Sequence, residues 1–306
     1  MMDGNFHLNM FPSRQSIIDI ASHLQTQPGF IEKDWYVTRV IHKISDIHSN
    51  KFIPIFCGGT SLLKGHNIIR RFSEDVDFRI LNLGDQINTR KQRRDFRNIL
   101  LAHIDSVGDM RILNDTIVSR DNSRFFSVNI SYPRIFDTVT SLRPEVKLEC
   151  TFVEHTIDNY DKKGIRSMAS KFTNEGNIVQ IPCLSLLETC TDKVSAFIWR
   201  VLSRKREVVG DDKTIIRHLY DLHELAKAQI DSERLNNEAR RVFNLDKKRG
   251  RISDSFYDAF KRVIIILDRD KKYEQEYNDY VLSMCFGIDN RPTYHEAIES
   301  FVNLIK

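Results

Sequence analysis

An apolar segment, a pair of glycines and an alternating segment follow one another in the first third of the chain. Lys51 to Phe56 has the short apolar run of a buried strand, and Gly58-Gly59 after it allows the backbone to turn sharply. Thr60 to Asn67 has the apolar spacing of a short helix, and Asp75 to Leu81 alternates like a second strand. The order strand, turn, helix, strand predicts a sheet with helices packed on it.

The same segment carries groups that suit a metal-bound phosphate. Gly58 and Gly59 expose backbone N–H groups, and the helix after them would direct its N-terminus at an anion. Successive side chains of a strand alternate between faces, so Asp75 and Asp77 project together. Hard oxygen ligands suit Mg²⁺, or Mn²⁺ in its place, with substrate phosphates completing the shell. Metal-assisted phosphoryl or nucleotidyl transfer from a nucleoside triphosphate is the leading hypothesis.

A third carboxylate is expected, either to contact metal or to draw a proton from an attacking hydroxyl. Glu145 to Val153 reads as a core strand, and Glu149 lies on its polar face. The alternative is that Glu149 only pairs with Lys147 or an arginine on that face. Glu154 replaces it as the candidate acid if the strand register is shifted.

Composition favours a globular, cytoplasmic protein without a membrane span. Of the 306 residues, 41% are hydrophobic and 29% are charged, which allows one large or two ordinary domains. No apolar run approaches the roughly 18 residues of a spanning helix, and the first residues lack the pattern of a secretory signal. The five cysteines form no Cys-x-x-Cys pair and are expected to be buried, reduced thiols.

The pattern of elements predicts an α+β fold in two parts. A mixed sheet with flanking helices is expected in a core domain, residues 1–181, and a helical domain in residues 182–306, with the junction near Pro182. In the core domain we expect helices at 13–25, 32–48 and 85–107 and further strands at 110–118, 124–132 and 145–153. In the second domain we expect helices at 184–203, 212–229, 232–243, 253–267, 273–284 and 294–305.

Positive charge is clustered although the net charge is only +4. The three basic runs are Arg90 to Arg94, Arg204 to Arg206 and Lys247 to Arg251. Such runs attract a polyanion through phosphate contacts, but each one alone is more typical of a solvated helix face. They indicate a nucleic-acid substrate only if they lie on one side of the fold.

At Gly58-Gly59-Thr60-Ser61-Leu62 and at Arg71-Phe72-Ser73-Glu74-Asp75-Val76-Asp77-Phe78, the chain resembles the nucleotidyltransferase superfamily with the DNA-polymerase-β-type core. More narrowly it is similar to the AbiEii/AbiGii toxin family, which includes the MenT toxins. A lysine and an aspartate on two later helices, Lys193 and Asp221, complete the resemblance, which spans roughly residues 30–225.

The resemblance assigns roles to individual residues. It implies that Gly58, Gly59, Thr60 and Ser61 bind phosphates, with Ser73 in the same site, and that Asp75 and Asp77 hold Mg²⁺. Lys193 matches the helical lysine of the third motif and would neutralise the triphosphate. Arg200, near the same helix face, would extend that positive field. Asp221 matches the aspartate of the fourth motif. Its role stays open between orienting Lys193, contacting the nucleotide, assisting proton transfer and simply pairing with Arg217.

The resemblance also implies a function. The chain would be a toxin of a bacterial toxin–antitoxin system that adds nucleotides to the 3′ end of tRNA and blocks translation. The antitoxin encoded beside it would act without a stable complex, and the helical domain would complete the active-site cleft. Three alternatives remain: a small-molecule nucleotidyltransferase of the aminoglycoside-modifying kind, a protein nucleotidyltransferase and a nucleotide-binding module without catalysis.

Overall fold

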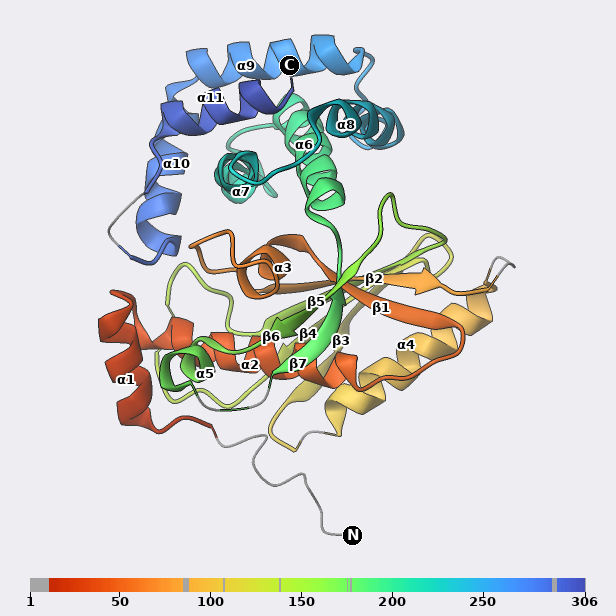
Figure 1. Ribbon diagram of the computed structural model, residues 1–306, viewed down its shortest axis with the longest axis vertical. Helices are drawn as coiled ribbons and strands as arrows, with labels where there is room; N and C mark the ends of the chain where they lie inside the picture. The colour runs from red at the N-terminus through yellow and green to blue at the C-terminus, as the bar shows by residue number, and fades with distance from the viewer. Residues whose placement is uncertain are drawn as a thin grey trace. The chain divides into compact units, whose positions relative to one another are not determined.

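The computed structural model describes residues 11–84, 88–106, 108–137, 139–174, 176, 178–287 and 291–305. The chain forms two compact units, Met1–Leu184 and Ser185–Lys306, which divide three residues after the junction expected from the sequence. Figure 1 shows strands and helices in the first unit and helices in the second. Among the described residues, no helix combines the length and the hydropathy that a membrane span requires. The α+β class expected from the sequence is confirmed.

The N-terminal unit is built on one seven-stranded mixed sheet, in the order β3-β4-β5-β2-β1-β7-β6. β2 pairs antiparallel with β1 and parallel with β5, so it lies in the middle of the sheet. The strands are β1 (Phe52–Cys57), β2 (Asp75–Asn82), β3 (Arg111–Arg120), β4 (Phe125–Ser131), β5 (Val146–Val153), β6 (Asp161–Ile165) and β7 (Val179–Cys183). The helices are α1 (Arg14–His23), α2 (Pro28–Ser45), α3 (Gly58–Lys64), α4 (Arg90–Asp105) and α5 (Met168–Thr173).

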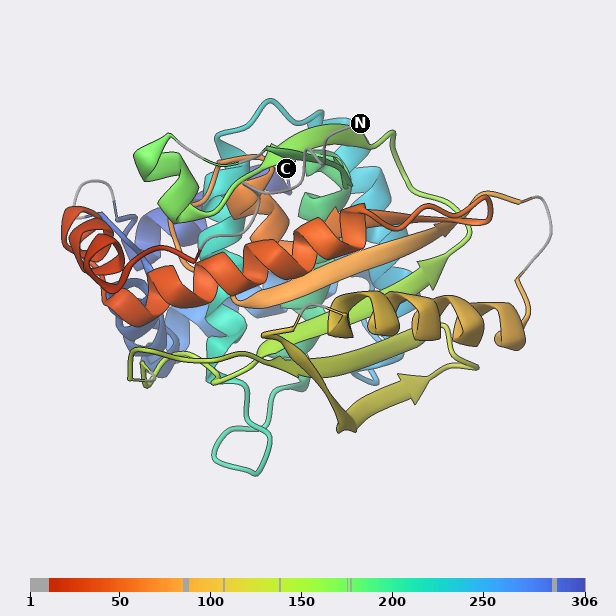
Figure 2. The same cartoon turned by 90° about the horizontal axis from the view of Figure 1, so that it is seen from below.

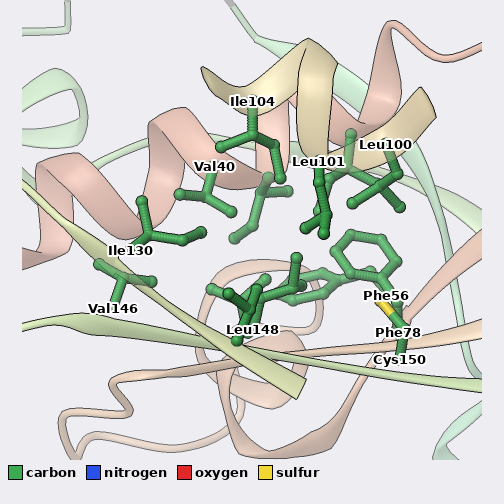
Figure 3. Close-up of a cluster of buried hydrophobic side chains, with 14 of the residues drawn as sticks. Val40, Phe56, Phe78, Leu100, Leu101, Ile104, Ile130, Val146, Leu148 and Cys150 are labelled. Carbon is green, nitrogen blue, oxygen red and sulfur yellow. The ribbon is translucent and has the colours of Figure 1, made fainter. Parts of the chain in front are cut away.

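One face of the sheet packs against α2 and α4, which lie side by side across it in Figure 2. The alternating residues of the central strands supply this core: Val76, Phe78 and Ile80 are all at most 1% exposed. Figure 3 shows Phe78 and Leu148 of β2 and β5 meeting Leu100, Leu101 and Ile104 of α4. Because side chains alternate along a strand, the polar residues of β2 and β5 must lie on the opposite face.

Three elements were not expected from the sequence: β6, β7 and α5. β6 reads Asp-Lys-Lys-Gly-Ile, which has one β-branched residue, Ile165, and no aromatic residue. β7 contains Pro182, which removes a backbone donor and usually marks a loop. Pairing explains both strands, because β6 and β7 form an antiparallel pair and β7 joins the sheet beside β1 at Phe56 and Cys183. The outer residues 85–87 and 107 of the expected long helix lie outside the described residues.

The C-terminal unit is helical. Its first helix, α6, begins after Ser185, whose hydroxyl accepts the Glu188 N–H as an N-cap, and packs against α7, α8 and α9. The elements are α6 (Leu186–Ser203), the short 3₁₀ helix η1 (Lys213–Ile216), α7 (Arg217–Ala226), α8 (Ser232–Asp246), α9 (Phe256–Arg269), α10 (Lys271–Met284) and α11 (Tyr294–Leu304). Every helix expected in this half of the sequence is present.

All five cysteines are free thiols. Four are buried, Cys150, Cys183, Cys190 and Cys285, while Cys57 at the end of β1 is partly exposed. Burial raises the pKa of Cys183 to about 11 and that of Cys190 to about 12, which leaves both thiols protonated at neutral pH.

Candidate active site

Asp75 and Asp77 lie at the start of β2, on the face of the sheet opposite the apolar core. Val76 and Phe78, which alternate with them, are buried in that core. On β5, Glu149 is in register with Asp77, and Lys147 is in register with Asp75. Residues in register on adjacent strands project to the same face, so all three carboxylates share one surface.

Glu149 fits both of the roles considered from the sequence. It lies beside Asp77, as a third acid of the site would, and it also forms an ion pair with Lys147 on the same strand. Glu154 lies beyond the end of β5 and accepts a hydrogen bond from the Asn82 amide at 2.8 Å, at the far end of β2 from Asp75. The register therefore brings Glu149, and not Glu154, to the two aspartates.

The donor set fits a hard divalent cation that is completed by substrate. Within the residues that the structure describes, no three histidine, cysteine or acidic side chains are arranged to hold a metal on their own. Two carboxylates on one face are nevertheless sufficient for Mg²⁺, which binds through one or two carboxylates, waters and the phosphates of a nucleotide. Asp75 and Asp77 are the residues that would hold it.

Gly58 allows the turn after β1 to approach the carboxylate of Asp77 closely. It has a φ of +75°, and a Cβ placed on it would lie 2.2 Å from Asp77 Oδ2. Cys57, just before it, is the register partner of Asp77 across the β1–β2 pair. The glycine is thus required by its backbone conformation and by the carboxylate beside it.

Gly58→Ala should therefore remove most activity. The alanine would be strained at positive φ, at a cost of about 1–3 kcal/mol in the free energy of unfolding. Its methyl group would displace the Asp77 carboxylate, and a misplacement of about 1 Å lowers turnover by about 10²-fold. Turnover and thermal melting of Gly58→Ala can be compared with those of Gly108→Ala, since nothing lies within 4 Å of a Cβ at Gly108. Wild-type turnover in Gly58→Ala would contradict the assignment.

The hydroxyl groups of the first turn are directed into the fold. Thr60 Oγ1 lies 2.9 Å from Ser73 Oγ and also contacts the backbone oxygen of Asp75. Its hydroxyl proton is therefore donated to another group of the N-terminal unit. Ser61 is fully buried, and its hydroxyl faces the Cys183 thiol. The Cys57 side chain makes no cap hydrogen bond at the start of α3. The groups of this turn that remain for binding a phosphate are consequently its backbone N–H groups, and Ser73 lies beside them.

Arg143 is a site residue that the sequence did not indicate. Its Nη2 donates to Asp75 Oδ1 at 2.7 Å, and its Nε donates to Glu74 Oε1 at 3.2 Å. Glu74 is held in turn by the buried Lys33, whose ammonium also donates to the Arg143 backbone oxygen at 2.6 Å. Burial lowers the pKa of Lys33. In the sequence Arg143 precedes a proline in a polar loop, where nothing marks it as a partner of Asp75.

Lys193 and Asp221 form a buried ion pair inside the C-terminal unit. Lys193 Nζ on α6 donates to Asp221 Oδ2 on α7 at 2.5 Å. The lysine is 7% exposed and the aspartate is fully buried, so any contact of Asp221 with Arg217 is a buried one and not a surface ion pair. Of the roles left open for Asp221, this contact favours orientation of the Lys193 ammonium.

Three arginines of the basic runs are held by contacts within the protein. Arg93 is buried, and its guanidinium donates to the backbone oxygens of Asn88 and Asn122. Arg204 pairs with Asp211 and Glu276, both at 2.7 Å, and Arg206 pairs with Asp270 and Glu276. These contacts fix the three guanidinium groups, although 20% of the Arg206 side chain is exposed. Of the other members, Lys247 donates to the Asp254 backbone oxygen and Arg249 pairs with Asp246. The other cations of the runs are exposed: Arg90, Lys91, Arg94, Lys205, Lys248 and Arg251.

The family of the chain follows from comparison with known proteins. The family model described as "Nucleotidyl transferase AbiEii toxin, Type IV TA system" matches residues 45–299, which is most of the chain. The chain belongs to this AbiEii family of nucleotidyltransferase toxins. The resemblance stated from the sequence motifs is thereby confirmed, as is nucleotidyl transfer as the reaction class.

Among solved structures, the AbiEii-family chain is similar to MenT4, a nucleotidyltransferase toxin from Mycobacterium tuberculosis. The identity is 15%, the alignment covers 94% of this chain and 89% of MenT4, and the TM-score is 0.58, which shows a common fold. A cyclic dinucleotide synthase from Elizabethkingia meningoseptica, CdnE with GTP and Apcpp, aligns over 95% of this chain and 97% of its own at 13% identity. Its TM-score of 0.26 is too low to support an argument. Curated protein sequences contain no significant match.

Proposed function

We propose that this AbiEii-family toxin transfers a nucleoside monophosphate from an NTP to the 3′ hydroxyl of tRNA in a Mg²⁺-dependent reaction, and so blocks translation. One observation carries the proposal: Asp75, Asp77 and Glu149 share one face of the sheet, and Gly58 packs directly on the Asp77 carboxylate. Membership of the AbiEii family supports nucleotidyl transfer by this site. The tRNA acceptor is inferred from the toxin class alone.

The first steps are binding and orientation. The backbone N–H groups after Cys57 and the Ser73 hydroxyl would bind the triphosphate, and Asp75 and Asp77 would hold the metal. Mg²⁺, or Mn²⁺ in its place, would offset the negative charge of the phosphates when bound. Arg143 donates to Asp75 Oδ1 and would keep this carboxylate oriented for the metal.

The transfer itself exchanges the α–β phosphoanhydride bond of the NTP for a phosphodiester bond to the acceptor. The acceptor oxygen forms a bond to the α-phosphorus, the bond from that phosphorus to the bridging oxygen breaks, and pyrophosphate leaves. Glu149 would accept the proton of the attacking hydroxyl. Lys193, oriented by Asp221, would stabilise the charge that develops on the leaving group.

The experiment that tests this function is incubation of the protein with each labelled NTP, Mg²⁺ and total tRNA, followed by a denaturing gel. Label in the tRNA band for at least one NTP is the expected result. Label in a small hydroxylated acceptor or in a polypeptide would instead identify one of the two other transfer reactions, and nucleotide binding without any transfer would indicate a non-catalytic module. The antitoxin is expected to act without co-purifying in a stable complex.

Arg143→Gln should lower turnover by about 10- to 100-fold, the usual cost of removing a group that orients a metal-binding carboxylate. Glutamine cannot contact Asp75 and Glu74 together, so the Asp75 carboxylate loses its fixed orientation. Steady-state rates and melting temperatures would be compared with those of Arg143→Lys, which retains the charge and should recover part of the turnover. Equal, wild-type rates in both variants would show that Arg143 has no part in positioning Asp75.

A further inference from the structure

Two of the three basic runs meet at the C-terminal end of α6. The run Arg204 to Arg206 directly follows the helix. The run Lys247 to Arg251 approaches the same helix through Gly250, where a Cβ would lie 3.3 Å from Trp199 Cε3 and 3.2 Å from Ser203 Cβ. The two runs are far apart in sequence, yet they border the same turn of α6.

A cavity of about 410 Å³ opens at this place, within the C-terminal unit. Trp199, Arg200 and Ser203 of α6 form one side, and the segment between α6 and η1, called here the 204–212 loop, forms the other. Figure 2 shows this segment as a loop that leaves α6 and returns toward the next helix. The volume lies within the range of about 300–1,000 Å³ that is typical of small-ligand sites.

Ion pairs hold the 204–212 loop in position. Arg204 links Asp211 of the loop to Glu276 of α10, both at 2.7 Å, and its side chain is only 5% exposed. Arg206 pairs with Asp270 at 2.8 Å, and its guanidinium lies 4.2 Å from the centroid of the Tyr273 ring. A loop that is already ordered loses little conformational entropy when it binds a ligand.

The charged side chains around the cavity that form no ion pair among the described residues are positive. Asp211 and Asp212 also line it, but Asp211 pairs with Arg204, and Asp212 lies 3.7 Å from Arg200. Lys205, Lys248 and Arg251 are exposed, and none of them forms an ion pair with any residue that the structure describes. Lys205 lines the cavity, and Lys248 and Arg251 flank the Gly250 that packs on the Trp199 indole. An indole ring with cations near it is the combination that binds single-stranded nucleic acid, through stacking and phosphate contacts.

The position along α6 connects this cavity to the reaction. Arg200 follows Lys193 by two helical turns, so both lie near one face of α6, about 10.5 Å apart along its axis. An RNA strand held at the cavity would therefore lie about two helical turns of α6 from the Lys193–Asp221 pair.

We propose that the cavity at Trp199 is the acceptor site for single-stranded RNA. A base stacks on Trp199 inside the cavity, and the neighbouring phosphates contact Lys205, Lys248 and Arg251. The inference rests on the proposed transfer to RNA, and it adds where that RNA is held.

The binding test uses a labelled single-stranded RNA oligonucleotide and the full chain, with affinity measured by fluorescence anisotropy over a range of salt concentrations. The triple variant Lys205→Gln/Lys248→Gln/Arg251→Gln should bind at least about tenfold more weakly. The slope of log affinity against log salt should fall by about 2, since each single-strand phosphate contact contributes about 0.7. The matched control removes three exposed cations of α8 and α9 that neither line the cavity nor flank Gly250, Arg240→Gln/Lys261→Gln/Arg269→Gln, and should retain the wild-type slope. Equal slopes in the two triple variants would overturn the proposal.

Trp199 provides a readout that lost charge alone does not change. The chain has two tryptophans, Trp35 and Trp199, and a base stacked on Trp199 should quench part of the emission. RNA should quench wild-type protein but not Trp199→Phe, in which Trp35 alone emits. Quenching that persists in Trp199→Phe would exclude stacking at this site.

The same samples separate failure of this inference from failure of the proposed function. Transfer of label to tRNA by wild-type protein, together with unchanged RNA binding in the cavity variants, would overturn only the acceptor site. If wild-type protein neither binds nor labels any RNA and labels a polypeptide instead, both the tRNA acceptor and the RNA site are wrong.

Discussion

Replacing Asp75 by asparagine should abolish nucleotidyl transfer, with turnover reduced by about 10³-fold or more, as for removal of other groups that stabilise transition-state charge. Asparagine keeps the size of the side chain and can still accept the hydrogen bond from Arg143. It removes the negative charge that would hold the metal. The fold should persist because the apolar neighbours Val76 and Phe78 are untouched.

The measurement is incorporation from each NTP, with thermal melting recorded on the same preparation. Asp109→Asn is a suitable control, since that carboxylate pairs with Arg39 outside the site and its side chain is 38% exposed. A folded Asp75→Asn protein with wild-type turnover in Mg²⁺ would refute the assignment of β2 as the metal-binding strand.

The second large effect is expected at the Lys193–Asp221 pair, where activity and stability must be separated. Lys193→Ala leaves the buried Asp221 carboxylate without its ammonium partner, and breaking a buried pair in this way costs about 3–5 kcal/mol. It also removes the cation that would face the leaving group, for which a loss of about 10²-fold or more is expected. Lost activity in this variant alone would therefore be ambiguous.

The double variant Lys193→Met/Asp221→Leu resolves the ambiguity. Replacement of both buried charges by apolar groups of similar size is often neutral for stability, so its melting temperature should lie near that of wild type. Turnover should remain as low as in Lys193→Ala, and Lys193→Arg should recover little, because a planar guanidinium does not replace a compact ammonium. A stable double variant with normal turnover would confine catalysis to the N-terminal unit.

Local patterns in the sequence were sufficient for most of the fold. The alternation of Asp75 to Leu81 predicted which side chains of β2 enter the core, and 3.6-residue periodicity located the helices of the C-terminal unit. β6 and β7 could not be predicted in this way. Their residues are polar or include proline, and they are strands because of the neighbours with which they pair.

The residues of the candidate site also fall into those that local patterns predicted and those that only the fold brings together. Gly58, Asp75 and Asp77 are close in sequence, so strand and turn geometry alone places them together. The contacts of Arg143 with Asp75 and of Lys193 with Asp221 join segments 68 and 28 residues apart. Such contacts depend on tertiary packing. Because burial also depends on tertiary packing, the runs of basic residues did not reveal that the Arg93 and Arg204 side chains are buried.

The uneven burial of the thiols gives this chain a built-in chemical reporter. Cys57 is the one partly exposed cysteine, and it immediately precedes Gly58, while burial keeps the Cys183 and Cys190 thiols protonated at neutral pH. A small alkylating reagent at mild pH should therefore modify Cys57 first. Nucleotide bound at the turn would shield it, so the rate of alkylation measures occupancy of the triphosphate site without any acceptor being known.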